Sequence, residues 1–158
     1  MKTGLTKQHK KRLLELARNT IANDLGLEEP KFKDEDFSEK IFREKRGVFV
    51  TLELYGNLRG CIGNIEPVYP LFEAVKRNAH EAAFEDPRFD PLASGEFPDI
   101  EIEISVLTIP PGRVREGRFT GQVPRLKGLF THTAILITEI PSTGHYQAAL
   151  PFIQQAIL

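Results

Sequence analysis

The chain has a single cysteine, Cys61, which lies between Gly60 and Gly63 in the segment GNLRGCIGNIEP at positions 56–67. Glycine permits positive φ and lets another group approach the backbone closely. The two glycines could therefore leave main-chain N–H groups open beside the sulfur, and such groups bind an oxyanion or a phosphate. The first hypothesis is a reactive thiol in a glycine-framed groove, with Gly60 and Gly63 as binding residues.

A cysteine nucleophile acts as its thiolate, so it needs a base or a positive neighbour. Arg59 would lower the pKa of the thiol and hold an anionic substrate, but a guanidinium cannot accept a proton. His80 is the best candidate base, because its helix follows the glycine-rich segment directly and could pack back on it. Glu81 or Glu85 would orient the imidazole. The predicted catalytic residues are therefore Cys61, His80 and Glu81.

Each of these residues also has a simpler interpretation. A lone cysteine on a strand is more often an inert small hydrophobic residue, and GCIG does not meet the G-x-S-x-G pattern of a nucleophile elbow. In EDPRFDPL, the aspartates are expected to cap turns, whereas Arg88 could project toward an anionic ligand in the same cleft. Neighbouring helical residues such as His80 and Glu81 point about 100° apart, so no metal site is predicted.

Composition limits the classes of protein that fit. Of 158 residues, 41% are hydrophobic and 27% are charged, which argues against a fully disordered chain. The net charge of −1 gives no global field for nucleic acid or an anionic membrane. Local basic groups leave nucleic-acid binding as a third function, through Lys7, Lys10, Lys11 and Arg12 or through Arg113, Arg115, Arg118, Arg125 and Lys127.

Cysteine content and hydropathy bear on the compartment. One cysteine excludes an internal disulfide framework and fits a reducing environment. The first residues, MKTGLTKQHKKRLLEL, contain no apolar run like that of a signal peptide, and no later run is long enough to span a bilayer. The expected location is the cytoplasm.

The elements that must position these residues can be read from periodicity. Residues 6–25 are predicted to form a helix with Thr6 as N-cap, ended by Gly26. Residues 48–54 alternate as a strand, and Gly56-Asn57 is typical of a tight turn, so the chain should return through 58–65 as the second strand of a hairpin that carries Cys61. The charged stretch 28–46 has few apolar anchors and is expected to be a surface loop or short helix.

Residues after the hairpin predict a helix through residue 84 and then a half-buried strand from Ile100 to Val106. Beyond Pro111 the pattern weakens to short strands, with a strand in LFTHTAILITEI and a terminal helix. This order predicts an α+β fold in which a largely antiparallel sheet is flanked by helices. The whole chain, 1–158, is expected to be one domain, with part of it forming a small subdomain.

Three segments together resemble the AMMECR domain family over about residues 10–111: LRGCIG, then AAFEDPRF with PL soon after, then EIEISVLT followed by two prolines. LRGCIG, at 58–63, matches the hallmark hexapeptide of that family one for one. The resemblance implies an antiparallel sheet in a larger and a smaller subdomain, with the hexapeptide at a groove. It also implies genomic association with Memo-like and radical-SAM proteins, and it implies no known reaction.

The sequence departs from the family pattern after about residue 112, where GQVPRLKGLFTHTAILITEI and PFIQQAIL stand in place of the usual strand and terminal helix. Three functions stay open: an enzyme or enzyme component that uses Cys61, a binding module for a peptide, small molecule or protein, and nucleic-acid binding. The residues name no cofactor, substrate or oligomeric state.

Overall fold

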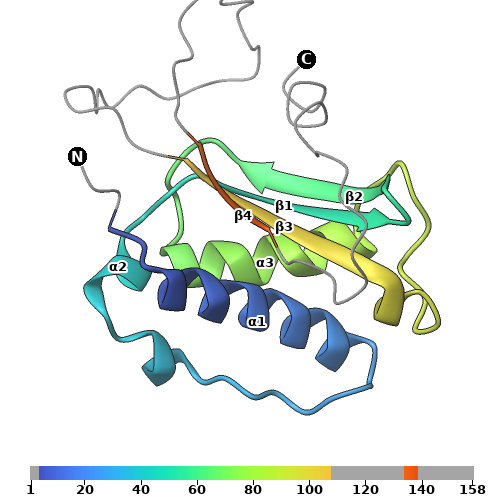
Figure 1. Ribbon diagram of the computed structural model, residues 1–158, viewed down its shortest axis with the longest axis horizontal. Helices are drawn as coiled ribbons and strands as arrows, with labels where there is room; N and C mark the ends of the chain where they lie inside the picture. Colours follow the sequence, from blue (N-terminus) through green and yellow to red (C-terminus); the bar gives the residue numbers. More distant parts are fainter. Residues whose placement is uncertain (1–3, 108–133, 139–158) are drawn as a thin grey trace, which may run out of the picture.

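The structure is a computed structural model that describes residues 4–107 and 134–138. A layer of helices lies on one face of a four-stranded sheet (Figure 1). The strand order is β2-β1-β3-β4, and each neighbouring pair is antiparallel. This arrangement confirms the predicted α+β class. The predicted terminal helix lies outside the described residues.

Helix α1 spans Lys7–Asp24, as the apolar spacing of the sequence predicts. Thr6 caps it: its hydroxyl accepts from the N–H of His9, and the His9 ring accepts from the N–H of Thr6. Such reciprocal bonds satisfy N–H groups that the first turn would otherwise leave without a partner. Gly26 has φ +71, a conformation that favours glycine and ends the helix as predicted.

The segment after α1 contributes to the core, which the sequence did not indicate. It contains a short 3-10 helix, η1, at Asp34–Phe37 and a single helical turn, α2, at Lys40–Arg43. Phe37 and Phe42 are fully buried, with ring centroids 5.2 Å apart, and Phe37 also stacks on Phe72 at 5.4 Å. The stretch expected to lie on the surface therefore places two aromatic rings inside.

Strands β1, Val48–Leu54, and β2, Asn57–Asn64, form the predicted hairpin. The turn lies one residue earlier than expected, at Tyr55 and Gly56, where φ is +52 and +76. Two consecutive positive φ angles match the right-handed twist of a hairpin, and glycine adopts the second at low cost. The position of the turn decides which residues pair across the hairpin.

Helix α3, Leu71–Phe84, packs beside α1 and against β1 and β2. A 3-10 turn, η2, at Phe97–Asp99 leads into β3, Ile100–Leu107, and β4 covers Ala134–Thr138 within the segment expected to be a strand. The helices cover one face of the sheet, and the strand residues buried against them alternate: Val48, Val50, Leu52, Ile100, Ile102, Ile104 and Val106. In the described part of the chain no helix has the length and apolarity to cross a bilayer.

Candidate functional site

Cys61 lies on β2, the edge strand of the sheet, opposite Thr51 of β1. Its N–H points away from β1 and donates to Oδ2 of Asp86 at 2.9 Å. Its carbonyl oxygen accepts from Nη2 of Arg88 at 3.3 Å. Edge strands leave such groups open to pairing with another chain. Here two side chains from the loop after α3, Asp86 and Arg88, form hydrogen bonds with the main chain of the edge strand at Cys61.

Asp86 is the central acceptor of this loop, with only 4% of its surface exposed. Its carboxylate accepts from Arg88 through Nη2 at 2.7 Å and Nε at 3.0 Å. The hydrogen bonds from the Arg88 side chain and from the N–H of Cys61 lower the pKa of Asp86 to about 2. The sequence predicted a turn cap at this aspartate. The structure shows in addition that Asp86 bonds the hexapeptide, and that Arg88 bonds Asp86 and Cys61.

The sulfur of Cys61 is half-buried and lies 3.2 Å from Oγ1 of Thr51. Burial raises the pKa of the Cys61 thiol, and the hydrogen bond with Thr51 and the charge of Arg88 offset this only in part. A thiol needs a lowered pKa to be a strong nucleophile at neutral pH. At rest, therefore, Cys61 is a neutral thiol.

Gly60 and Gly63 are sites of close packing. A Cβ on Gly60 would collide with the carbonyl oxygen of Ala82 in α3, and one on Gly63 would collide with the carbonyl oxygen of Val48 and the ring of Phe49. Gly60 thus lets β2 approach α3 closely, and Gly63 lets β2 pack closely against Val48 and Phe49 of β1. The expectation that they leave main chain open beside the sulfur is wrong at the N–H of Cys61, because Asp86 occupies it.

Arg59 lies at a bulge, because Leu52 pairs with Gly60 while the next residue, Glu53, pairs with Leu58. Its guanidinium makes two hydrogen bonds to the Glu96 carboxylate, each of 2.9 Å. Glu96 also accepts from the N–H of Ala93 at 2.8 Å. A two-bonded arginine–carboxylate pair fixes both groups. Arg59, predicted to hold an anionic substrate, is instead paired within the protein.

His80 does not reach Cys61. Its Nδ1 lies 2.8 Å from Asp24 of α1, and its Nε2 lies 3.4 Å from Glu85. Ala82, two residues further along α3, packs on Gly60, and two helical residues turn by about 200°. His80 therefore faces away from the hexapeptide. The structure does not support the predicted pairing of His80 with Cys61 as its base, and no hydrogen bond joins them in the described chain.

His80 and Glu81 instead line a cleft of about 580 Å³ between α1 and α3. The hydrogen bond to Asp24, with a further one to Glu85, raises the pKa of His80. Charges of both signs surround the cleft, whose lining is Thr20, Asp24, Asp34, Phe72, Glu73, Lys76, Arg77, His80, Glu81 and Glu85. The predicted site residues thus divide between two places: the sheet edge and this cleft.

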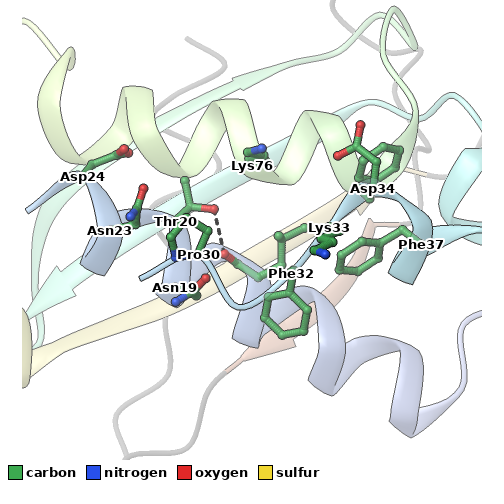
Figure 2. A pocket seen from close by; sticks show the side chains of 12 residues that line it. Asn19, Thr20, Asn23, Asp24, Pro30, Phe32, Lys33, Asp34, Phe37 and Lys76 are labelled. Carbon is green, nitrogen blue, oxygen red and sulfur yellow. Dashed lines mark hydrogen bonds between the residues drawn. The ribbon is translucent and has the colours of Figure 1, made fainter. Parts of the chain in front are cut away.

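A smaller cavity of about 100 Å³ adjoins the cleft and shares five lining residues with it: Thr20, Asp24, Asp34, Phe72 and Lys76. Figure 2 shows the residues that line this cavity on α1 and on the loop that carries Phe32 and Lys33, with Lys76 on α3. Together the two cavities hollow the outer side of the helical layer. In residues 4–107 and 134–138, no cluster of three or more acidic, histidine or cysteine side chains could hold a metal ion.

Sequence reasoning missed the neighbours of Cys61 across the sheet. Thr51 faces Cys61 on one side and Glu103 of β3 on the other, so the three residues form a row across three strands. Burial raises the pKa of Glu103, and the charge of Glu53 adds to this effect. Alternation had placed Glu103 on the polar side of its strand. The register that brings it beside Thr51 is a tertiary feature.

Two of the four residues in the N-terminal basic group, Lys11 and Arg12, have partners. Arg12 donates to the carbonyl oxygen of Asp36 at 2.7 Å, and Lys11 lies 3.7 Å from Glu15. The second basic group, from Arg113 to Lys127, lies outside the described residues. No feature of the described chain adds support for nucleic-acid binding.

The sequence model of the AMMECR1 family matches residues 14–135, more than three quarters of the chain. This chain belongs to the AMMECR1 family. The match extends past residue 111, where the resemblance was expected to end. The hexapeptide, the Asp86–Arg88 loop and the cleft all lie inside the matched region.

Known AMMECR1-family relatives are similar over part of their length. A protein of Methanothermobacter thermautotrophicus is 45% identical over 106 residues, covering 67% of this chain and 55% of that protein. A protein of Sulfurisphaera tokodaii is 49% identical over 62% of this chain and 45% of its own length. The crystal structure of an uncharacterized protein, PH0010, from Pyrococcus horikoshii matches with TM-score 0.57 and 40% identity, covering 66% of this chain and 53% of that one. The chain thus spans about half the length of these relatives.

Proposed function

We propose that this AMMECR1-family chain is a binding module in which Cys61 is structural. The observation that carries the proposal is the bonding of the hexapeptide: the N–H, carbonyl oxygen and sulfur of Cys61 each have a partner, in Asp86, Arg88 and Thr51. Burial also raises the pKa of the thiol. A nucleophile needs the opposite: a free sulfur and a thiolate at neutral pH.

The proposed ligand site is the cleft between α1 and α3. Its volume of about 580 Å³ lies in the range of small-molecule sites, roughly 300–1,000 Å³. Lys76, Arg77 and a protonated His80 offer donors and positive charge, while Asp24 and Glu73 offer acceptors. A ligand that carries both charges, such as an amino acid or the end of a peptide, matches this lining.

A panel of free amino acids and dipeptides tests the cleft by mapping changes in backbone NMR signals of the chain. We expect saturable changes centred on Asp24, Lys76 and His80. The variant Lys76→Ala should weaken binding, while Lys7→Ala, an exposed change on α1, should not. Cys61→Ser should bind as the wild type does. Signal changes confined to β2, or loss of binding in a folded Cys61→Ser variant, would contradict the proposal.

An enzyme that uses Cys61 is the second candidate, and the row of Cys61, Thr51 and Glu103 favours it. The Glu103 carboxylate makes no hydrogen bond to Thr51 at rest and would have to turn toward its hydroxyl; the thiol proton would then pass to the Thr51 oxygen as the hydroxyl proton of Thr51 passes to the Glu103 carboxylate. A carboxyl group with a raised pKa is a better base at neutral pH than an ordinary one. In this alternative, Glu103→Gln slows alkylation of Cys61 by iodoacetamide at neutral pH and Glu73→Gln does not. Equal rates in the two variants exclude Glu103 as the base.

A further inference from the structure

The outer face of the sheet, opposite the helices, carries carboxylates from two strands. On β1, Thr51 and Glu53 alternate with core residues, and on β3 the same is true of Glu101, Glu103 and Ser105. Glu53 pairs with Glu101 and Thr51 pairs with Glu103, so Glu53 and Glu103 are diagonal neighbours. Diagonal positions of this kind lie about 7–8 Å apart, within reach of long side chains.

Two polar atoms on this face are buried without a partner. Glu53 is 8% exposed and Glu103 is 7% exposed. Oε1 of Glu53 and Oγ of Ser105 are each buried with no hydrogen-bond partner in the described chain. Buried polar atoms in native proteins are almost always hydrogen-bonded, and an exception calls for an explanation such as a bound water or ion. The unpartnered Oε1 of Glu53, diagonally beside Glu103, therefore points to an occupant, whereas Oγ of Ser105 lies one same-face position beyond Glu103.

No cation of the described residues balances these carboxylates. Glu53 and Glu103 take part in no hydrogen bond or ion pair of the described chain, and the charge that acts on each is negative: Glu101 on Glu53, and Glu53 on Glu103. The arginines nearest in the chain to Cys61 are already paired, Arg59 with Glu96 and Arg88 with Asp86. A buried carboxylate without a partner is costly, so this face favours a bound positive charge.

We propose that this face binds an organic cation that carries N–H donors, an ammonium or a guanidinium group, between Glu53 and Glu103. The N–H groups would donate to Oε1 of Glu53 and to the carboxylate of Glu103, and the positive charge would balance the two carboxylates. A metal ion fits less well, because no three ligating side chains of the described residues converge on one point. The hydroxyl of Thr51 and the thiol of Cys61 border the site in the same row.

This inference goes beyond the binding function proposed for the cleft. The cleft residues Lys76 and His80 lie on the helical layer, whereas Glu53 and Glu103 lie on the sheet face that the helices do not cover. Experiments could show that the sheet face binds no cation although the cleft binds its ligand, or that the cleft binds no ligand although the sheet face binds a cation. The residues whose NMR signals change distinguish the two outcomes.

The test uses pairs of small probes that differ in charge and have the same shape. Methylguanidinium is compared with N-methylurea, and propylammonium with 1-propanol, by calorimetry and NMR on the full chain. We expect saturable binding of both cations at neutral pH, with signal changes at Glu53 and Glu103, and at least tenfold weaker binding of the neutral probes. Equal affinity within each pair, or changes confined to Lys76 and His80, would overturn the proposal.

Two variants remove one carboxylate charge each, Glu103→Gln and Glu53→Gln. Each should weaken binding of methylguanidinium at least tenfold, while the exposed helical change Glu15→Gln should have no effect. If one variant does not fold, the other and the probe comparison on the wild type decide. Wild-type affinity in a folded Glu103→Gln or Glu53→Gln variant would contradict the site.

Proton release gives a further readout. Besides each other, the charged or titratable groups that act on Glu53, Glu103 and Cys61 are Glu101, Asp86 and Arg88. Binding of a cation favours ionised carboxylates, so at mildly acidic pH it should release protons, and the measured heat should depend on the ionisation enthalpy of the buffer. The Glu103→Gln variant should release fewer protons. Heat that is independent of the buffer at every pH would contradict binding at these carboxylates.

Discussion

At the scale of single residues, two motifs that lie 20 residues or more apart in the sequence form one bonded unit. The hexapeptide supplies the main chain of Cys61, and the EDPRF segment supplies Asp86 and Arg88, which bond it on both sides. Asp86 is buried, and its negative charge is balanced by Arg88 alone among the described ion pairs. The charge of Asp86 is therefore a stabilising feature of the hexapeptide.

Replacing Asp86 with Asn should destabilise the fold at neutral pH by about 2 kcal/mol, which is the free energy that corresponds to a pKa lowered from 3.8 to about 2. Because the pKa is lower in the folded state, this stabilisation is present above pH 3.8 and is lost as the pH falls toward 2. Urea unfolding across this range measures it. The exposed change Asp90→Asn serves as control and should cost much less. A difference between wild type and Asp86→Asn that does not shrink with falling pH would contradict the explanation.

At the scale of elements, β2 rests on α3 through a glycine. A methyl group on Gly60 would overlap the carbonyl oxygen of Ala82, and because that atom belongs to a helix backbone, it cannot move without displacing the helix. Overpacking of this kind costs about 1–3 kcal/mol. We therefore expect Gly60→Ala to lower the free energy of unfolding by that amount.

Gly95 provides the matched control for Gly60. A Cβ at Gly95 meets no atom within 4 Å, so Gly95→Ala should leave stability nearly unchanged. Chemical denaturation of both variants under the same conditions compares them. Equal stability of Gly60→Ala and Gly95→Ala would show that the contact between β2 and α3 can relax, contrary to this expectation.

His80 joins the end of α1 to α3, since it contacts Asp24 on one helix and Glu85 at the end of the other. The pKa of His80 is raised in the folded state, so the protonated ring stabilises the fold below its ordinary pKa of about 6.5. This contribution is lost as the pH rises through the folded pKa. The variant His80→Gln should therefore lose more stability at pH 5.5 than at pH 8.5, as measured by thermal unfolding. The same loss at both pH values would contradict the ionic role of His80.

At the scale of the whole molecule, the helices and the sheet share one core, and the two candidate sites lie on its two sides. One cluster of buried apolar residues joins α1, η1, α2, α3, β1 and β3. The helices lie on one face of the sheet (Figure 1). The cleft is lined by residues of α1 and α3, whereas Glu53 and Glu103 alternate along β1 and β3 with the residues that pack on the helices. We expect ligand binding at one site to leave the ligand affinity of the other site unchanged, because the packed core separates the two sites.

Local signals in the sequence predicted the elements well. Thr6 and Gly26 bound α1 because capping depends on a few adjacent residues, and alternation predicted β1 and β3. The burial of Phe37 was not predicted, because the charged residues around it show no helical or strand periodicity of apolar residues. The turn was placed one residue late, since Tyr55 adopts a positive φ that its residue type does not indicate.

The candidate site was harder to predict because it depends on register and on the return of a loop. His80 was assigned to Cys61 from proximity in sequence, but the phase of α3 turns Ala82 toward β2 and His80 away from it. Asp86 reaches Cys61 only because the chain after α3 folds back along the edge strand. Glu103 lies beside Thr51 because β1 pairs with β3. The register of that pairing cannot be predicted from the sequence of either strand alone.

The reactivity of Cys61 as a function of pH tests the binding-module proposal most directly. The rate of alkylation by iodoacetamide is measured on the folded chain from pH 6 to pH 11 and compared with the same chain in denaturant. If Cys61 is a structural thiol, its rate at neutral pH is lower in the folded chain and its midpoint lies above the ordinary value of about 8.5. A midpoint below 8 with fast labelling in the folded chain would contradict the proposal and make Cys61 a nucleophile.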